Sequence, residues 1–113
     1  MFEQSRIYYL YSEPCDMRKS FNTLSGLVQT EMKLSVLSGA GFVFINKRKT
    51  HLKMLLWEGD GLSLYFKRLS KGTFEHPKTN QTHQISYEKL LLVLRGISTK
   101  QIIKRKRYSL LKK

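Results

Sequence analysis

Two carboxylates near the centre of the chain are the first candidates for chemistry. Glu58 and Asp60 stand among glycines and beside Trp57, in the run Trp-Glu-Gly-Asp-Gly. Such a pair could hold a divalent metal ion in a small metal-dependent nuclease, but no third ligand accompanies it. Gly59 and Gly61 also suit the turn of a hairpin, where positive φ angles are needed. We favour the turn and keep the nuclease as an alternative.

The other residues that commonly bind metals or catalyse reactions do not form a recognisable set. His51, His76, His83 and Cys15 lack the spacing of a zinc site. There is no Gly-x-Ser-x-Gly nucleophile elbow and no phosphate-cradling glycine loop. We therefore expect no enzymatic activity, no cofactor and no metal.

Charge is the strongest compositional signal. Twenty-one Lys and Arg outnumber eight Asp and Glu, which gives a formal net charge of +13. An excess of this size repels itself in a folded domain, so we expect a polyanionic partner, nucleic acid rather than an anionic membrane surface. The single cysteine, the lack of a signal-like start and the lack of an apolar run of about 20 residues indicate a cytoplasmic, nucleoid-associated protein.

Basic residues gather in several places that could contact phosphates. One is the expected tip of a hairpin, whose three adjacent cations are Lys47, Arg48 and Lys49. A second is the first turn of an expected helix, where Arg18 and Lys19 would lie beside exposed amides that suit a phosphate. The alternative is that Asp16 and Glu13 simply neutralise these two cations.

A third group combines cations with aromatic side chains on one face of an expected hairpin. Its members are Lys53, Trp57, Tyr65 and Lys67, with Arg68 next in the chain. Such a face resembles a platform on which bases stack, although it could equally lie beneath a helix with its lysines at the rim. The last group is a basic run near the C-terminus, formed by Lys104, Arg105, Lys106 and Arg107.

Aromatic and apolar runs separated by short connections predict the strands that carry these groups. The expected strands span 7–11, 42–45, 52–57 and 62–69, with an edge strand at 83–85. A three-residue loop at 58–60 would pair Leu56 with Leu62 and Met54 with Leu64, which gathers apolar side chains on one face. We therefore expect an antiparallel meander of about four or five strands.

Two helices complete the expected fold. Apolar residues at three- and four-residue steps predict a helix over 16–33 that begins at Asp16. The almost uniformly apolar run at 87–95 predicts a buried helix between an N-cap at Ser86 and a stop at Gly96. The fold class is thus α+β: one domain over 1–97, with a basic tail over 98–113 that is either helical or ordered on binding.

Six short motifs follow one another in a fixed order along the chain. They are Asp-Met-Arg-Lys at 16–19, Leu-Ser-Gly at 37–39, Phe-Val-Phe at 42–44, Lys-Met-Leu-Leu-Trp at 53–57, Lys-Arg-Leu at 67–69 and Gly-Thr-Phe at 72–74. This ordered set resembles the TnpB-type accessory proteins from the second open reading frame of insertion-sequence family sixty-six. The family usually has glycine in place of Ser20. It more often has an aromatic residue in place of His76.

The resemblance implies a bacterial mobile-element protein that assists transposition, while a separate, larger transposase carries the acidic catalytic triad. On this basis we expect a non-catalytic protein that binds DNA at or near the element's ends and helps to assemble the complex with the transposase. The alternative is a protein-interaction adaptor that contacts the transposase without touching DNA.

Overall fold

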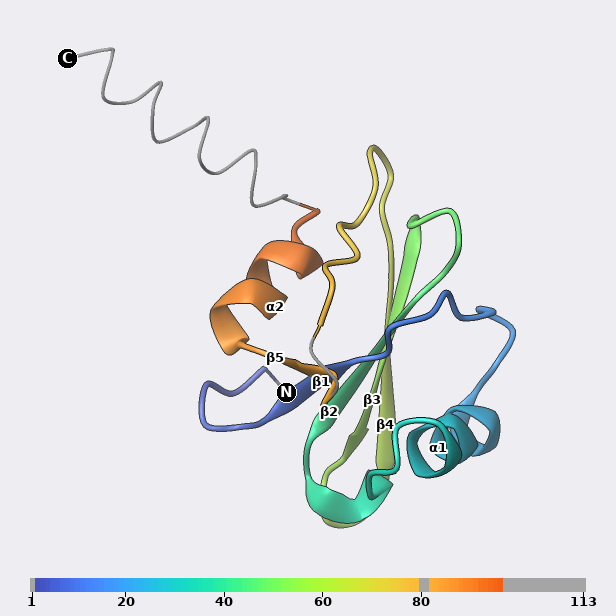
Figure 1. Cartoon of the computed structure of the whole chain (residues 1–113), viewed down its shortest axis with the longest axis vertical. Coiled ribbons are helices and arrows are strands. Elements are labelled where there is room, and N and C mark those ends of the chain that lie inside the picture. The colour runs from blue at the N-terminus through green and yellow to red at the C-terminus, as the bar shows by residue number, and fades with distance from the viewer. Residues whose placement is uncertain (1, 80–81, 97–113) are drawn as a thin grey trace, which may run out of the picture.

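The computed structural model describes residues 2–79 and 82–96, which form one sheet and the helices around it (Figure 1). The elements follow one another in this order: β1 (Tyr8–Leu10), α1 (Phe21–Thr30), the short 3-10 helix η1 (Val36–Ser38), β2 (Gly41–Ile45), β3 (His51–Trp57), β4 (Leu62–Arg68), β5 (Gln84–Ile85) and α2 (Tyr87–Leu94). The α+β class expected from the sequence is confirmed. No helix in the described part of the chain is both long and apolar enough to cross a membrane.

The five strands form one mixed sheet in the order β4-β3-β2-β1-β5. β2, β3 and β4 make an antiparallel meander, as expected, and β5 pairs antiparallel with β1 at the far edge. β1 runs parallel to β2, however, which differs from the expected antiparallel sheet. The long connection from Leu10 to Gly41 contains α1 and provides the crossover that a parallel pair requires.

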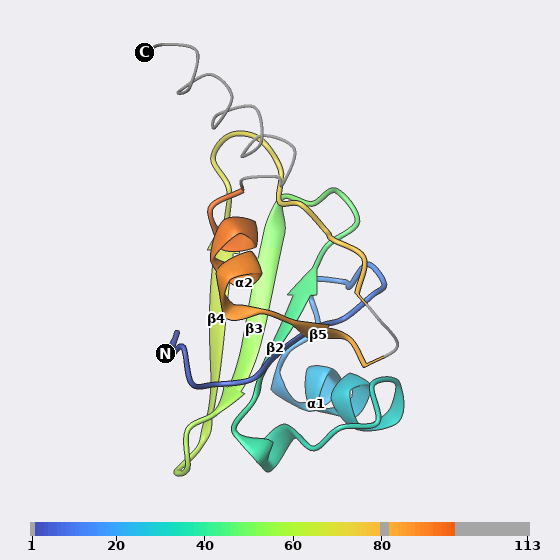
Figure 2. The ribbon, with the colours of Figure 1, turned by 60° about the vertical axis from the view of Figure 1, so that its left-hand side comes forward.

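Helices cover both faces of the sheet, so the molecule has three layers (Figures 1 and 2). The face under α1 buries a cluster that includes Leu24, Val28, Phe42, Phe44 and Leu55. The face under α2 buries a second cluster that includes Leu10, Val43, Ile45, Met54 and Leu90. All five residues of β2 are buried, because this central strand has a helix-covered core on each side.

The two covered faces explain why the expected register between β3 and β4 is wrong. The structure pairs Leu56 with Ser63, across a four-residue turn closed by a hydrogen bond from the Glu58 amide to the Gly61 carbonyl (2.9 Å). A three-residue loop is favoured only if the apolar side chains must share one face. Since β3 has a core on both sides, it buries Leu55 and Leu56 on opposite faces.

α1 begins at Phe21, later than the expected start at Asp16. The carboxylate of Asp16 accepts a hydrogen bond from the Arg18 amide two residues on (2.9 Å), which forms a local turn instead of a helix start. Ser20 is the N-cap residue, and the helix ends at Thr30. Arg18 and Lys19 therefore lie in a turn before the helix, not in its first turn.

α2 agrees closely with its prediction. The side chain of Ser86 caps the helix by accepting a hydrogen bond from the Lys89 amide (3.2 Å), and Gly96 follows the helix with a φ of +70°. Lys67 adds a tertiary contact, because its ammonium donates to the Leu94 carbonyl at 2.6 Å. A cation at this end of a helix also opposes the negative end of the helix dipole.

Candidate nucleic-acid interface

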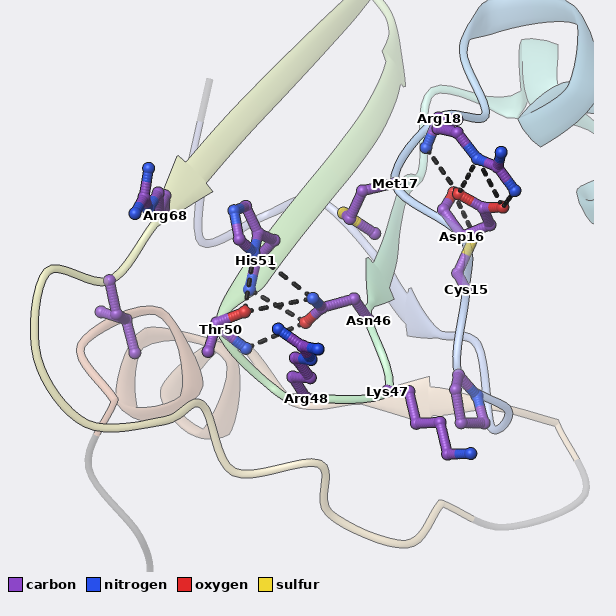
Figure 3. Close-up of a pocket in the computed structure, with 12 residues that line it drawn as sticks. Cys15, Asp16, Met17, Arg18, Asn46, Lys47, Arg48, Thr50, His51 and Arg68 are labelled. Atoms are coloured by element: carbon purple, nitrogen blue, oxygen red, sulfur yellow. Dashed lines mark hydrogen bonds and ion pairs between the residues drawn. The ribbon is translucent and has the colours of Figure 1, made fainter.

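An open cleft of about 1050 Å³ lies where the β2–β3 turn, the turn before α1 and the end of β4 meet (Figure 3). Four cations and one acid line it: Arg18, Lys47, Arg48, Arg68 and Asp16. The other lining residues are Pro14, Cys15, Met17, Asn46, Thr50, His51 and Leu69. The meander places the end of β2, the start of β3 and the end of β4 at one end of the sheet. Segments distant in the sequence are thereby brought together.

The basic tip of the β2–β3 hairpin is fixed by Asn46. The side-chain Oδ1 of Asn46 accepts hydrogen bonds from the backbone amides of Thr50 (2.9 Å) and His51 (3.0 Å). Its backbone carbonyl accepts a third from the Lys49 amide (3.0 Å), and Lys49 adopts a left-handed φ of +60°. The three cations of the tip are exposed, and Lys49 is the one that does not line the cleft. The tip thus presents its charges from a well-defined backbone.

His51 belongs to the same network, and its partners define its tautomer. Because Asn46 Oδ1 already accepts two amides, Asn46 Nδ2 is the donor toward Thr50 Oγ1 (3.1 Å) and His51 Nδ1 (3.3 Å). The Thr50 hydroxyl in turn donates to His51 Nδ1 (2.7 Å). Neutral His51 therefore accepts at Nδ1 and carries its proton on Nε2, at the wall of the cleft.

On another wall of the cleft, Arg18 forms an ion pair with Asp16 (Figure 3). The guanidinium donates from Nε to both carboxylate oxygens (3.1 and 3.0 Å) and from Nη2 to Oδ2 (2.6 Å). These hydrogen bonds lower the pKa of Asp16 from its ordinary value of 3.8 to about 2, and they raise the pKa of Arg18. The side chain of Arg18 is 91% exposed. Its Nη1 takes no part in the pair, so the guanidinium keeps donors for a ligand.

Besides Lys49, three of the lysines expected to contact nucleic acid do not line the cleft, namely Lys19, Lys53 and Lys67. The ammonium of Lys53 donates to the backbone carbonyls of Met17 (2.7 Å) and Lys19 (2.8 Å), which ties β3 to the turn before α1. Lys67 donates to the Leu94 carbonyl, as described above. Lys53 and Lys67 therefore have partners within the fold, and Lys19 contributes a carbonyl to one of them.

The expected platform of cations and aromatic rings on one face of the β3–β4 hairpin is wrong. In the observed register Lys53 and Trp57 point to the α1 face, whereas Tyr65 and Lys67 point to the α2 face. Tyr65 packs edge-on against Phe2, with ring centroids 5.0 Å apart. The sheet therefore separates the two aromatic rings that were expected to stack bases together.

The turn that contains Glu58 and Asp60 lies at the end of the sheet opposite the cleft, and both side chains are exposed. Within residues 2–79 and 82–96, no group of three His, Cys, Asp or Glu is arranged to hold a metal ion. The basic run from Lys104 to Arg107 lies outside the described residues. The cleft is therefore the place where four of the predicted basic residues converge, namely Arg18, Lys47, Arg48 and Arg68.

Comparison with known protein families agrees with the motifs. The family described as "IS66 Orf2 like protein" matches residues 6–104, a range that includes every residue of the cleft. The chain belongs to the IS66 Orf2-like family. This IS66 Orf2-like protein is therefore an accessory protein of transposition.

Two relatives of the IS66 Orf2-like protein come from Sinorhizobium fredii (strain NBRC 101917 / NGR234). The uncharacterized protein y4hO is 37% identical over 83 residues, and the uncharacterized protein y4jC is 34% identical over 84 residues. Each match covers 73% of this chain and 72% of the relative. No solved structure matches the chain significantly.

The sequence of the IS66 Orf2-like protein did not predict the polar residues that shape the cleft, namely Asn46, Thr50 and His51. The signal that could have revealed them is an asparagine directly after an apolar strand and before a basic turn. Asparagine side chains often accept backbone amides in turns, so Asn46 pointed to a stabilised tip. Thr50 and His51 carried no such signal, because their roles depend on the folded turn.

Proposed function

We propose that this IS66 Orf2-like protein binds DNA at or near the ends of its element through the cleft and thereby assists the transposase. The observation that carries the proposal is the convergence of Arg18, Lys47, Arg48 and Arg68 on one open cleft that has a single acid. Cations gathered in this way can neutralise several phosphates of one DNA backbone. The formal net charge of +13 adds long-range attraction.

The cleft combines charge with a defined geometry. Asn46 fixes the backbone of the tip that carries Lys47 and Arg48, and Asp16 orients the guanidinium of Arg18. An arginine held by a carboxylate on one side presents its remaining donors in a fixed direction. We therefore propose that the cleft positions a DNA backbone, and that Arg68 closes the site from the end of β4.

The C-terminal segment supplies a second contribution in this proposal. Residues 98–113 contain seven of the 21 Lys and Arg, including the run from Lys104 to Arg107, and no acid. The fourteen remaining Lys and Arg against eight acids leave a net charge of +6 on residues 1–97. A basic arm attracts any phosphate backbone, so deleting residues 98–113 should weaken binding to all duplexes about equally.

A salt-varied binding assay tests the proposal. Fluorescence anisotropy would compare a duplex from the element's end with an unrelated duplex of equal length. If about five phosphates are neutralised, the logarithm of the binding constant should fall with the logarithm of salt with a slope of about −4 to −5. Removing two cleft cations with Lys47→Gln and Arg48→Gln should make this slope about 2 units shallower and reduce the preference for the element's end.

The matched control removes two cations that do not line the cleft, with Lys33→Asn and Lys89→Gln. This control variant should keep the preference for the element's end and most of the slope of the binding constant against salt. Equal salt slopes for the two double variants would show that the cleft is not part of the DNA interface. If the unmodified protein does not bind DNA at low salt, the adaptor function is favoured, in which the chain contacts the transposase alone.

A further inference from the structure

Among the strands of residues 2–79 and 82–96, β4 is an outer edge of the sheet and pairs only with β3. It is seven residues long. Its pairing with β3 runs without interruption from Leu62, which lies opposite Trp57, to Arg68, which lies opposite His51. The other outer strand, β5, has two residues. β4 therefore offers the longer row of backbone groups for pairing with another chain.

The ladder shows which backbone groups of β4 point outward. The Glu58 amide bonds to the Gly61 carbonyl, and the Leu69 amide bonds to the Thr50 carbonyl, so both are hydrogen-bonded pairs of the ladder. Such pairs alternate with non-hydrogen-bonded pairs along an antiparallel ladder. The residues whose amides and carbonyls face away from β3 are therefore Leu62, Leu64, Phe66 and Arg68. No backbone hydrogen bond joins these groups to another of the described residues.

This edge lacks the features that usually prevent pairing. β4 contains no proline and no bulge, and the side chain of Phe66 is 50% exposed. Its charges stand at the two ends, where Asp60 precedes the strand and Lys67 and Arg68 are its last two residues. The middle of the edge is apolar, with Leu62 and Leu64 beside Phe66 on the α1 face.

We propose that β4 pairs antiparallel with β4 of a second copy of this chain, with the two Leu64 residues opposite each other at the two-fold axis. In this register Leu62 lies opposite Phe66, and Asp60 lies opposite Arg68, each pair occurring twice. The outward amides and carbonyls of the strand then find partners. The two sheets become one continuous sheet.

Charge selects both the partner and the register. Two copies of a chain with a net charge of +13 repel each other, so a stable contact must pair opposite charges. The antiparallel arrangement does so, because the acidic end of one β4 meets the basic end of the other. Neighbouring registers place Asp60 opposite Ser70 or Phe66 and lose this pair.

Leu64→Pro tests the pairing through the backbone. The Leu64 amide faces away from β3, so proline removes an outward donor and leaves the internal ladder intact. Sedimentation equilibrium of the full chain without DNA should show a mass that rises with concentration toward twice that of one chain. The Leu64→Pro variant should stay at the mass of one chain, with a circular dichroism spectrum like that of the unmodified protein.

A charge exchange tests the register even if the proline variant folds poorly. Asp60→Arg and Arg68→Asp should each weaken the dimer several-fold, and the double variant should restore it. A chain that stays monomeric at every concentration, or a double variant weaker than both single variants, would overturn the proposal. The result is separate from DNA binding, since the dimer is measured without DNA. Leu64→Pro keeps every cation of the cleft, whereas Arg68→Asp removes one.

Discussion

The ammonium of Lys53 lies 2.8 Å from the backbone carbonyl oxygen of Lys19. The same ammonium donates to the Met17 carbonyl at 2.7 Å, so a side chain from the middle of β3 holds the backbone on both sides of Arg18. The charge of Lys53 is consequently used within the fold. A basic residue can therefore support the proposed DNA site by positioning another basic residue.

Replacing Lys53 with Met should lower the free energy of unfolding by about 1–3 kcal/mol, because two backbone carbonyls lose a charged donor. The turn that carries Arg18 also loses its anchor, so the preference for the element's end should fall. Urea unfolding and the anisotropy assay measure the two effects.

The matched control is Lys67→Met, which removes the same charge and a similar contact, at the Leu94 carbonyl. It should lose comparable stability and keep the preference for the element's end. If both variants keep that preference to the same degree, Lys53 has no positioning role.

Asn46 offers a second test, because stability and charge can be changed separately at this residue. Asn46→Ala leaves the amides of Thr50 and His51 without their acceptor and should cost about 1–3 kcal/mol of stability. Asn46→Asp keeps the acceptor but places a negative charge in the cleft. The free energy of unfolding of the Asp variant, measured in urea, should therefore be closer to that of the unmodified protein than the Ala variant's is. The Asp variant should nevertheless bind DNA less tightly. An Asp variant that binds DNA as tightly as the unmodified protein would contradict the proposed interface.

The parts of the fold that depend on local sequence were predictable, and those that depend on distant contacts were not. α2 was predictable because Ser86, the apolar run and Gly96 lie within one short stretch. The β3–β4 register was not, because it depends on α1 and α2 covering opposite faces of the sheet. The parallel pairing of β1 with β2 likewise joins strands on either side of α1.

The cations of the candidate site were predictable from the sequence, but their arrangement was not. Residue type alone marked Arg18, Lys47, Arg48 and Arg68 as cations that could contact phosphates. The meander brings the last three to one end of the sheet, beside the turn that carries Arg18. Their convergence could not be read from the sequence, because it requires the turn before α1 to lie beside the β2–β3 tip. The hydrogen bonds of Lys53 within the fold could not be predicted for the same reason, since their acceptors are carbonyls of a distant turn.

The ion pair between Asp16 and Arg18 has a measurable pH signature. The pKa of Asp16 is lowered from 3.8 to about 2, so the contribution of this carboxylate to stability is present above pH 3.8 and is lost as the pH falls through about 2. Arg18→Gln should return the pKa of Asp16 toward 3.8. A carbon-detected NMR titration of the carboxyl groups measures this, with Arg48→Gln as a control that should leave Asp16 unchanged. An Asp16 midpoint near 3.8 in the unmodified protein would show that the pair does not form in solution.

Gly41 is the first residue of β2 and packs closely against β1. A Cβ atom at this position would lie 2.7 Å from Cδ1 of Tyr8 and 3.2 Å from Sδ of Met54, and both side chains are buried. The Tyr8 ring cannot shift freely, because its hydroxyl donates to the Glu3 carbonyl (3.0 Å) and accepts from the Glu3 amide (2.8 Å). Gly41→Ala should therefore destabilise the fold by about 1–3 kcal/mol.

Gly26→Ala is the matched control for this prediction. Gly26 lies within α1, and an added Cβ would have no neighbour within 4 Å, so alanine should stabilise the protein by roughly 0.5–1 kcal/mol through its higher helix propensity. Urea unfolding of both variants should give free-energy changes of opposite sign. A Gly41→Ala variant as stable as the unmodified protein would mean that β1 and β2 are not packed as closely as the Tyr8–Gly41 pairing requires.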